Sequence, residues 1–462
     1  MSWPAVILWV LLIYFCASRG PGLLYLMLIS GTFGSLQMLP FSGGVNLLPQ
    51  SACAAAFVMK ALVQRGNISR AIDSAIDLQR MALFTVFVIY GVFSAFVFPR
   101  AFLGLFEVVP ISITLSGADI LHPSSGNFTQ SCYFILSYAT SLIFSVIGLS
   151  SATRLHYRRA LIWSAYALVV SGIIDLVAFT LGISTVLEPF RTASYAFLTD
   201  VEAEGVKRVV GLMPEASTYG TACVGMMGTL LFLRPLYEEV SERRSCRIAI
   251  VLLGIMTVLS TSSTGFIGLA MLGAVYACDL LYRMLNKDSF RRGNIPGELM
   301  VVSLSALSVV FMFLLNPALF DPLLAMLNTM VFQKTTSASY VERSMWTRFG
   351  WNAFLETGGM GAGLGSIRVS NWTVSILGST GSFGAALMFG FIVQCLLMGA
   401  RNASGEMRAF VAALKLSLLP ILGMYSLVAT VPDIGIPLAV SLGLISSGHT
   451  RISRSSFRAG YS

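Results

Sequence analysis

Charged residues are scarce in this chain of 462 residues. Asp, Glu, Lys and Arg make up 11% of it, whereas 56% of the residues are hydrophobic. Water-soluble domains average about 25% charged residues, so this composition excludes an ordinary soluble protein. A helix that crosses a bilayer needs about 20 mostly apolar residues, and the chain has many such runs. The sequence therefore predicts an all-α polytopic integral membrane protein, with residues 1–462 forming a single integral-membrane domain.

Histidine and cysteine are also few and scattered. The three histidines are isolated from one another, and no two of the seven cysteines form a CxxC pair. We therefore expect no metal site, no disulfide and no cofactor. The N-terminus lacks the basic segment and the small-residue cleavage site of a signal peptide, so we expect its first apolar run to be a retained span.

The apolar runs predict twelve to fourteen membrane-spanning helices. Their candidate ranges are 3–17, 21–40, 47–63, 81–99, 132–149, 160–183, 219–233, 248–259, 266–282, 299–315, 374–397, 409–428 and 432–445. If these spans alternate in direction, three sizeable loops lie on the outer side, near residues 100–131, 185–218 and 316–373. The last two are long and charged, whereas the first is polar with few charges.

Basic residues are distributed unevenly between the two sides. Twenty-two of the thirty Lys and Arg residues lie on one side of the alternating spans. Such an excess marks the cytoplasmic side, so it predicts a cytoplasmic C-terminus and explains the net charge of +9 without nucleic acid. The other eight cations lie in the outer loops, where orientation does not account for them: Arg100, Arg191, Lys207, Arg208, Lys334, Arg343, Arg348 and Arg368.

The first group of candidate site residues lies where the second outer loop re-enters the membrane. It comprises Lys207, Arg208 and Glu215, with Arg191 upstream. Neighbouring cations can hold a phosphate, because a guanidinium binds it through two hydrogen bonds and an ammonium acts as a point charge. Pro214 can start a helix, and the helix dipole would stabilise a carboxylate there. A helix cap with an interfacial salt bridge is the alternative explanation.

The second group combines cations, an aromatic ring and a glycine-rich run in the third outer loop. Its members are Glu342, Arg343, Trp346, Arg348, Gly363, Gly365 and Arg368. We expect arginines to hold a pyrophosphate, the ring to lie against a sugar, and glycine N–H groups to form an anion-binding nest. The run is no P-loop, because no Lys-Ser/Thr pair follows it. An interfacial aromatic belt with snorkelling arginines is the alternative.

Two further polar features lie within or between the spans. Asp175 lies in an apolar span, where a carboxylate has either a functional role or a structural partner. The run Ser-Thr-Ser-Ser-Thr-Gly at 260–265 joins two spans at the outer side. It either satisfies the helix ends or lines a cavity.

Between about residues 188 and 384, the chain resembles the O-antigen and exopolysaccharide polymerases of the Wzy type, which are relatives of the O-antigen ligases. The resemblance rests on the order of Arg208, Gly211, Pro214–Ser217, the Ser/Thr turn at 260–265, Arg348 and Gly359–Gly365. Ligases usually carry a His-Asn pair where this chain has Ser370 and Asn371, which favours a polymerase. Many relatives have an Arg in the Ser/Thr turn, and this chain has none there.

The resemblance implies a metal-independent glycosyltransferase of GT-C-like architecture in the bacterial inner membrane, with its active site facing the periplasm. It would transfer a growing glycan from undecaprenyl pyrophosphate to a sugar hydroxyl of another lipid-linked repeat unit. Arg208, Arg343 and Arg348 would stabilise the leaving pyrophosphate, and Glu215 would accept the proton of the hydroxyl. Substrate would be bound by Lys207, Arg191, Glu342, Trp346, Arg368, Gly363 and Gly365, with Glu342 the second choice for the base. Further partners would be membrane lipids, a chain-length regulator and a flippase.

Two alternatives stay open at this point: an O-antigen ligase, and a flippase or other transporter of lipid-linked oligosaccharides. A transporter usually has polar or ionisable residues through its spans and an internal repeat. Here the spans are mostly bare, the charges lie in loops, and no repeat is visible. The sequence therefore favours an enzyme at the outer surface of the membrane.

Overall fold

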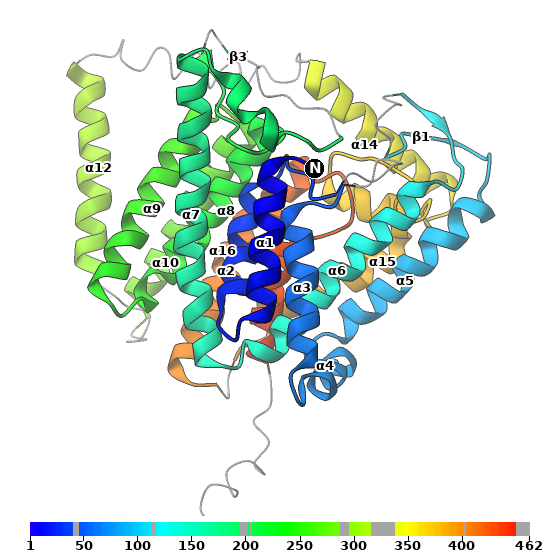
Figure 1. The fold of residues 1–462 in the computed structure, drawn as a ribbon, viewed down its shortest axis with the longest axis horizontal. Coiled ribbons are helices and arrows are strands. Elements are labelled where there is room, and N and C mark those ends of the chain that lie inside the picture. Colours follow the sequence, from blue (N-terminus) through cyan, green and yellow to red (C-terminus); the bar gives the residue numbers. More distant parts are fainter. Residues whose placement is uncertain are drawn as a thin grey trace, which may run out of the picture.

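The computed structural model of the chain describes residues 1–39, 46–111, 117–194, 202–203, 206–286, 295–315, 338–400 and 403–449. Helices form almost all of its regular structure (Figure 1). They are α1 (Trp3–Ala17), α2 (Gly22–Ile29), α3 (Pro49–Val63), α4 (Asn67–Ile76), α5 (Ala82–Ala101), α6 (Ser125–Ile147), α7 (Ser151–Thr180), α8 (Ala216–Leu233), α9 (Val240–Leu259), α10 (Ser263–Leu285), α12 (Ile295–Leu315), α14 (Ala338–Glu356), α15 (Trp372–Leu397), α16 (Gly405–Val428) and α17 (Gly435–Ser447).

Short elements connect these helices. Three are 3₁₀-helices: η1 (Ser30–Thr32), η2 (Ser184–Phe190) and η3 (Arg234–Leu236). Two are antiparallel hairpins, in which β1 (Glu107–Val108) pairs with β2 (Asp119–Ile120) and β3 (Glu202–Ala203) pairs with β4 (Val206–Lys207). The predicted outer cation Lys334 and the basic C-terminal tail that follows His449 lie outside the described residues.

Within the described residues, seven helices are long and apolar enough to cross a membrane: α5, α6, α7, α8 with η3, α10, α15 and α16. Several shorter helices, among them α1, α3 and α17, are also apolar. Each of the thirteen predicted apolar ranges overlaps one helix. The all-α, polytopic membrane architecture predicted from composition is thereby confirmed.

Some helix boundaries differ from the prediction. α7 begins at Ser151 and α9 at Val240, eight or nine residues before the predicted spans. An apolar range predicted from hydropathy stops at the first cations. Arginine nevertheless favours helices, and here the cations form ion pairs. Arg154 pairs with Glu406 at 2.7 Å, and Arg159 with Glu242 at 2.5 Å. α4 and α14 were not predicted at all, because both are too polar to stand out.

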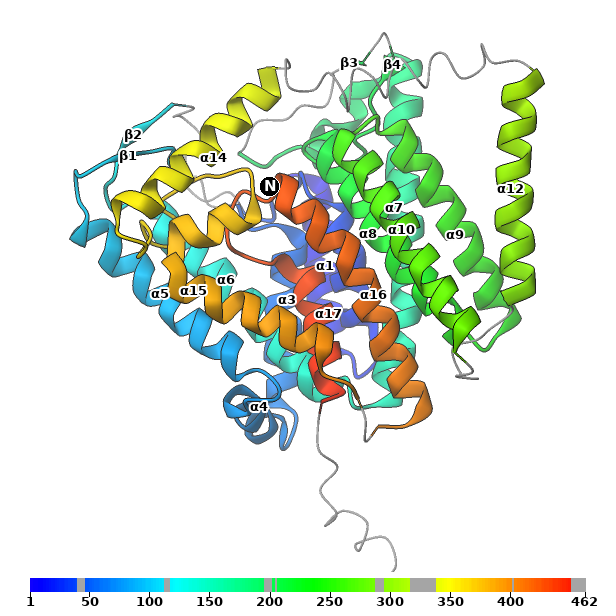
Figure 2. The same ribbon diagram turned by 180° about the vertical axis from the view of Figure 1, so that it is seen from behind.

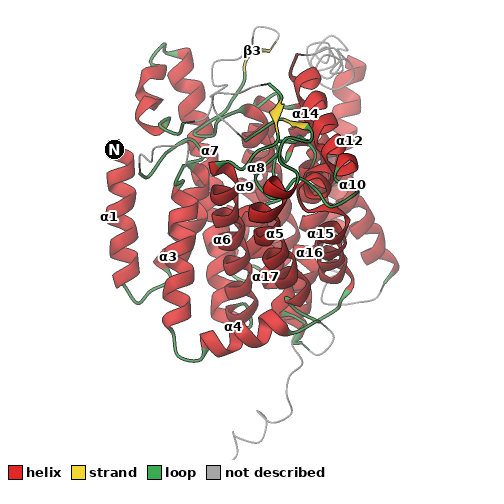
Figure 3. Ribbon diagram, turned by 90° about the vertical axis from the view of Figure 1, so that its right-hand side faces the viewer, coloured by secondary structure: helices red, strands yellow, loops and turns green. Residues whose placement is uncertain are grey.

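The helices form a bundle with different elements at its two ends (Figure 2). Seen from the side, α4 lies at one end, and α14 and β3 lie at the other (Figure 3). We call these the α4 end and the α14 end. α17 contacts both α6 and α16, and most of its side chains are buried in the core. α12 stands at the edge of the bundle, and its described side chains from Met300 to Leu314 are exposed.

The described parts of the three predicted outer loops all lie at the α14 end (Figure 1). They contain the β1–β2 hairpin, η2 with the β3–β4 hairpin, and α14 with the glycine-rich run that follows it. A backbone hydrogen bond joins the last of these loops to the first, from the N–H of Arg368 to the carbonyl oxygen of Val109 at 2.7 Å. The loops therefore pack on one another, which brings candidate site residues from distant parts of the chain together.

Candidate functional site

Glu215 lies at the point where the second outer loop meets α14. It is the N-cap residue of α8, in an extended conformation, and its Oε1 accepts a hydrogen bond from the Ser217 hydroxyl. Nη2 of Arg343, on α14, lies 3.4 Å from both carboxylate oxygens of Glu215. Helix N-termini favour a negative charge, so the position suits an ionised carboxylate. Two segments 128 residues apart thus meet in one half-buried ion pair.

Two more guanidinium groups interact with this pair. Burial lowers the pKa of Arg208, which Glu215 raises and Arg343 lowers. Burial also lowers the pKa of Arg368, which Glu342 and Glu215 raise and Arg343 lowers. Arginine still stays protonated at neutral pH. These charges therefore act on one another across a single region of the α14 end.

Trp346 packs beneath one of these arginines. The guanidinium carbon of Arg368 lies 4.4 Å from the centre of the Trp346 ring, in cation–π geometry. The side chain is 9% exposed, and its Nε1–H has no hydrogen-bond partner in the described part of the chain. The same holds for the buried Nε–H of Arg208. Buried donors are nearly always hydrogen-bonded, so each of these two N–H groups is a candidate to donate to a bound acceptor. The buried Nε–H groups of Arg80, Arg158 and Arg191 also lack described acceptors, so this feature is not confined to the site.

We call this group the arginine site; its members are Arg208, Glu215, Glu342, Arg343, Trp346 and Arg368. Its described side chains carry three positive and two negative charges, together with two buried donors that lack described acceptors. An excess of both cations and hydrogen-bond donors suits an anionic ligand with several acceptor oxygens. The arrangement can therefore bind a phosphate or diphosphate group.

Lys207 and Arg191 lie elsewhere, in a buried ion cluster around Asp175 of α7. Oδ1 of Asp175 lies 3.1 Å from Nη2 of Arg191 and 3.7 Å from Nζ of Lys207. The Lys207 ammonium also lies 5.0 Å from the centre of the Phe179 ring. All three charged side chains are at most 5% exposed. The structure thus gives Asp175 structural partners and separates both predicted substrate-binding cations from the arginine site.

Arg348 also lies apart from Glu215. It follows Arg343 by five residues on α14, which turns it about 140° around the helix axis. Its side chain is exposed, and no described residue forms an ion pair with it. The structure therefore brings Arg208, Arg343 and Arg368 together but not Arg348.

The glycine-rich run packs against neighbouring helices. Gly363 and Gly365 have φ angles of 97° and 83°. A Cβ atom would lie 2.7 Å from the carbonyl oxygen of Ser94 at the first position and 2.5 Å from that of Gly126 at the second. The N–H of Gly363 donates to the carbonyl oxygen of Ser379 at 2.9 Å. That N–H is used within the protein, contrary to the anion-binding nest that we expected; a substrate contact at Gly365 stays a prediction.

The Ser/Thr turn at 260–265 satisfies helix ends, one of its two predicted roles. Oγ of Ser262 accepts a hydrogen bond from the N–H of Gly265 at 3.3 Å and so caps α10. Thr261 has a φ angle of 44° and a buried hydroxyl without a described partner. The N–H of Val209, next to Arg208, donates to the carbonyl oxygen of Leu259 at 3.1 Å. The turn therefore supports the backbone beside the arginine site.

Asp433, in the loop between α16 and α17, was not predicted. Burial raises its pKa to about 6, against the lowering effect of the polar groups of Ser137, Gly435 and Ile434. Its buried Oδ1 has no hydrogen-bond partner among the described residues. Its loop runs beside the segment after Arg368, since the N–H of Val369 donates to the carbonyl oxygen of Thr430 at 3.2 Å. A signal was present in the sequence, because Asp433 is the only acidic residue after Glu406.

Comparisons with known proteins add no identification. No protein-family model matches the chain, and no curated protein matches it either. The chemistry of the site is therefore inferred from its own residues.

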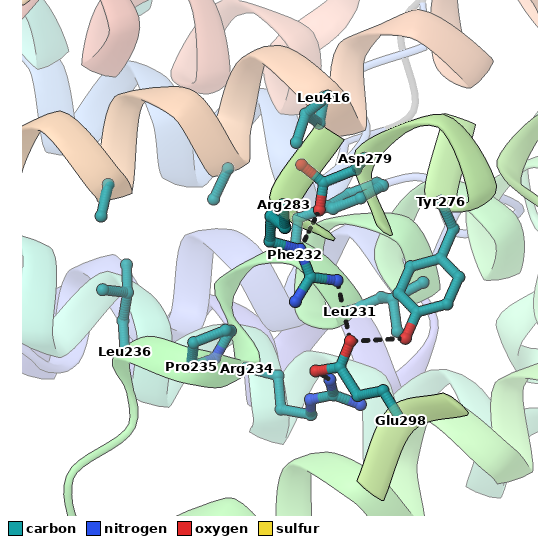
Figure 4. Close-up of a pocket in the computed structure, with 12 residues that line it drawn as sticks. Leu231, Phe232, Arg234, Pro235, Leu236, Tyr276, Asp279, Arg283, Glu298 and Leu416 are labelled. Carbon is teal, nitrogen blue, oxygen red and sulfur yellow. Dashed lines mark hydrogen bonds and ion pairs between the residues drawn. The ribbon is translucent and has the colours of Figure 1, made fainter. Parts of the chain in front are cut away.

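A second ionic cluster, the Glu298 cluster, lies at the α4 end of the bundle (Figure 4). Glu298, in the first turn of α12, accepts hydrogen bonds from Arg234, from Nη2 of Arg283 at 2.8 Å and from the Tyr276 hydroxyl at 2.9 Å. Nε of Arg283 donates to Asp279 at 2.8 Å. These side chains line a cavity of about 40 Å³. The cluster ties the start of α12 to α10 and η3.

Proposed function

We propose that this protein is a polysaccharide polymerase of the bacterial inner membrane. It transfers a growing glycan from undecaprenyl pyrophosphate to a sugar hydroxyl of another lipid-linked repeat unit. The observation that carries the proposal is the arginine site: three guanidinium groups, and two buried donors without acceptors among the described residues, at one end of an apolar helical bundle. The resemblance between residues 188 and 384 supplies the reaction.

The leaving group determines what the site has to do. As the bond between the anomeric carbon and the pyrophosphate oxygen breaks, negative charge develops on the pyrophosphate. Cations and N–H donors aimed at that charge are usually the largest catalytic contribution. Arg208, Arg343 and Arg368 provide the cations, and Nε1–H of Trp346 an additional donor. No step of this scheme requires a metal ion.

The acceptor hydroxyl must lose its proton while its oxygen attacks the anomeric carbon. Glu215 is our first choice for the base and Glu342 the second. The 3.4 Å contact from Arg343 to Glu215 is longer than the 2.7–2.9 Å typical of charge-assisted hydrogen bonds. A diphosphate that draws Arg343 toward itself would free the Glu215 carboxylate to accept the proton. Such a base contributes about 10²–10⁴ in rate.

The proposal includes a membrane orientation. Twelve to fourteen helices cross the bilayer in a GT-C-like arrangement, and the thirteen apolar ranges are the candidates. The α14 end faces the periplasm. Its support is the charge asymmetry, because the short loops toward the α4 end carry most of the Lys and Arg residues. The C-terminus is then cytoplasmic. A chain-length regulator and a flippase are the expected protein partners.

A deletion experiment separates polymerase from ligase and flippase. Cells that lack a polymerase still display surface glycan, but with a single repeat unit per chain. Cells that lack a ligase or a flippase display no surface-attached glycan. We expect single repeats, resolved by gel electrophoresis of extracted glycolipid. Complete loss of surface glycan would contradict the proposal.

A further inference from the structure

We infer that Asp175 is a positioning residue that holds the chain on both sides of Arg208, through the Lys207 side chain and the backbone of Val210 and Gly211, and so presents Arg208 to the anionic ligand. This inference rests on the proposed function, since it assumes that the arginine site binds a diphosphate. Asp175 itself has no contact with the ligand in this scheme. It acts through the segment that leads from β4 to α8.

The contacts of Asp175 enclose Arg208 in the sequence. Before Arg208, the ammonium of Lys207 lies 3.7 Å from Oδ1 of Asp175. After it, the N–H groups of Val210 and Gly211 donate to Oδ2 of Asp175 at 2.8 and 3.1 Å. The carboxylate therefore holds one side chain and two backbone groups within four residues of the arginine that lacks a described partner for its Nε–H.

Close packing makes this attachment rigid. Gly211 has a φ angle of 60°, and a Cβ atom there would lie 2.7 Å from Oγ of Ser171 and 2.9 Å from Cε2 of Tyr219. Ser171 belongs to α7, as Asp175 does, and Tyr219 belongs to α8. The segment between Arg208 and Glu215 is thus pressed against both helices, and a small displacement would move the guanidinium of Arg208.

A carboxylate also joins more elements here than a neutral residue could. Hydrogen bonds from two N–H groups require only an uncharged acceptor. The negative charge of Asp175 also forms an ion pair with Arg191, the residue that directly follows η2. Nη2 of Arg191 lies 3.1 Å from Oδ1 of Asp175. A buried charge is tolerated only when it is paired and hydrogen-bonded, and the Asp175 carboxylate meets both conditions. Three segments therefore meet at one side chain that is 2% exposed.

The test measures the binding of a short-chain prenyl diphosphate to the full-length protein in lipid nanodiscs by calorimetry. We expect Asp175→Asn to weaken binding at least tenfold. The matched control is Asp279→Asn, which removes another buried carboxylate, 7% exposed, from the Glu298 cluster, and we expect it to bind within twofold of wild type. Equal weakening in both variants would mean general destabilisation and would overturn the inference.

A double-mutant cycle tests whether Asp175 acts through Arg208. In an Arg208→Ala background, Asp175→Asn should weaken binding by less than twofold, because the positioned group is gone. A full tenfold loss in that background would overturn the inference. If wild type itself fails to bind the prenyl diphosphate, the proposed function fails as well; if wild type and Asp175→Asn bind equally, only the inference fails.

A second variant keeps the test decisive where Asp175→Asn does not fold. Gly211→Ala disturbs the same segment without changing any charge, and we expect it to weaken binding at least fivefold. Its control is Gly182→Ala, at a φ angle of 68° in open space, which should bind as wild type does. Normal binding by Gly211→Ala would show that this segment does not position the ligand-binding group.

Discussion

The arginine site and the Glu298 cluster are built from the same kinds of side chain at opposite ends of the bundle, yet their bonding differs. In the Glu298 cluster, two arginines face two carboxylates and a tyrosine, and none of its buried polar atoms lacks a partner. In the arginine site, three arginines face two carboxylates, and two buried donors have no acceptor among the described residues. We therefore expect the Glu298 cluster to act as an anchor, and we propose the arginine site, with its excess of cations, as the binding site. Both clusters contain arginines, so the presence of arginine alone does not distinguish them.

The largest effect should come from breaking the anchor. Glu298→Ala leaves Arg234 and Arg283 without their shared carboxylate, and Glu298 is only 10% exposed. Removing one partner of a buried ionic network typically costs about 3–5 kcal/mol. We expect a much lower unfolding temperature in detergent but normal polymerising activity per folded molecule. Loss of activity with unchanged stability would reverse the roles of the two regions.

The next effect should come from the binding site. Arg343→Ala removes a cation that lies against Glu215 and would face the leaving pyrophosphate. Loss of one such group commonly lowers kcat by about 10²–10³-fold. We expect that loss in the rate at which purified protein extends a lipid-linked repeat, with an unfolding temperature close to wild type. Full activity in Arg343→Ala would remove the arginine site from the mechanism.

Asp433 extends the comparison to a carboxylate whose pKa is set by burial. Its pKa of about 6 lies above the ordinary value of 3.8, so the folded protein holds a proton that the unfolded chain releases between those pH values. The stability that this proton provides is present below about pH 4 and is lost as the pH rises through 6. Asp433→Asn should therefore be more stable than wild type above pH 6, by about 1–3 kcal/mol.

Thermal unfolding at pH 4.5 and pH 8 measures this difference for Asp433. The gain from Asp433→Asn should shrink at the lower pH, because both side chains are then mostly uncharged. Asparagine keeps an oxygen that can face the polar groups of Ser137 and Gly435. If Asp433→Asn is less stable than wild type at pH 8, the negative charge of Asp433 stabilises the folded protein, contrary to this prediction.

The smallest effect should come from Arg348. The family resemblance assigns it a catalytic role, but the structure turns it away from Glu215 and leaves it exposed. We expect Arg348→Ala to retain at least one third of the polymerising rate, measured beside Arg343→Ala in the same preparation. A loss as large as that of Arg343→Ala would mean that α14 presents both of its arginines to substrate.

The helices were predictable because an apolar run that crosses a bilayer must satisfy its backbone hydrogen bonds within its own segment, which a helix does. Each of the thirteen predicted ranges overlaps a helix, and errors concentrate at ends where arginines begin, as in α7 and α9. The polar helices α4 and α14 escaped detection because they lack that signal. Helix formation there depends on packing at the ends of the bundle, which hydropathy does not record.

The sequence showed which residues could form the candidate site but not how they are arranged. Sequence order could not show that Arg343 meets Glu215 while Arg191 and Lys207 are buried against Asp175. These cations have the same charge and all lie in predicted outer loops, so the sequence gives no basis for separating them; their burial and partners do. The glycine-rich run shows the same limit, because the N–H groups of Ala362 and Gly363 donate to carbonyl oxygens of α15. Asp433 was overlooked because it is the second residue of the predicted apolar range 432–445 and belongs to no motif.

The most direct test of the central claim is a structure of the protein in nanodiscs with an undecaprenyl diphosphate, determined by electron cryo-microscopy. The account predicts diphosphate density within hydrogen-bonding distance of the Arg343 guanidinium and of Nε of Arg208, at the α14 end. Density at the Glu298 cluster, or a diphosphate bound away from these arginines, would contradict it.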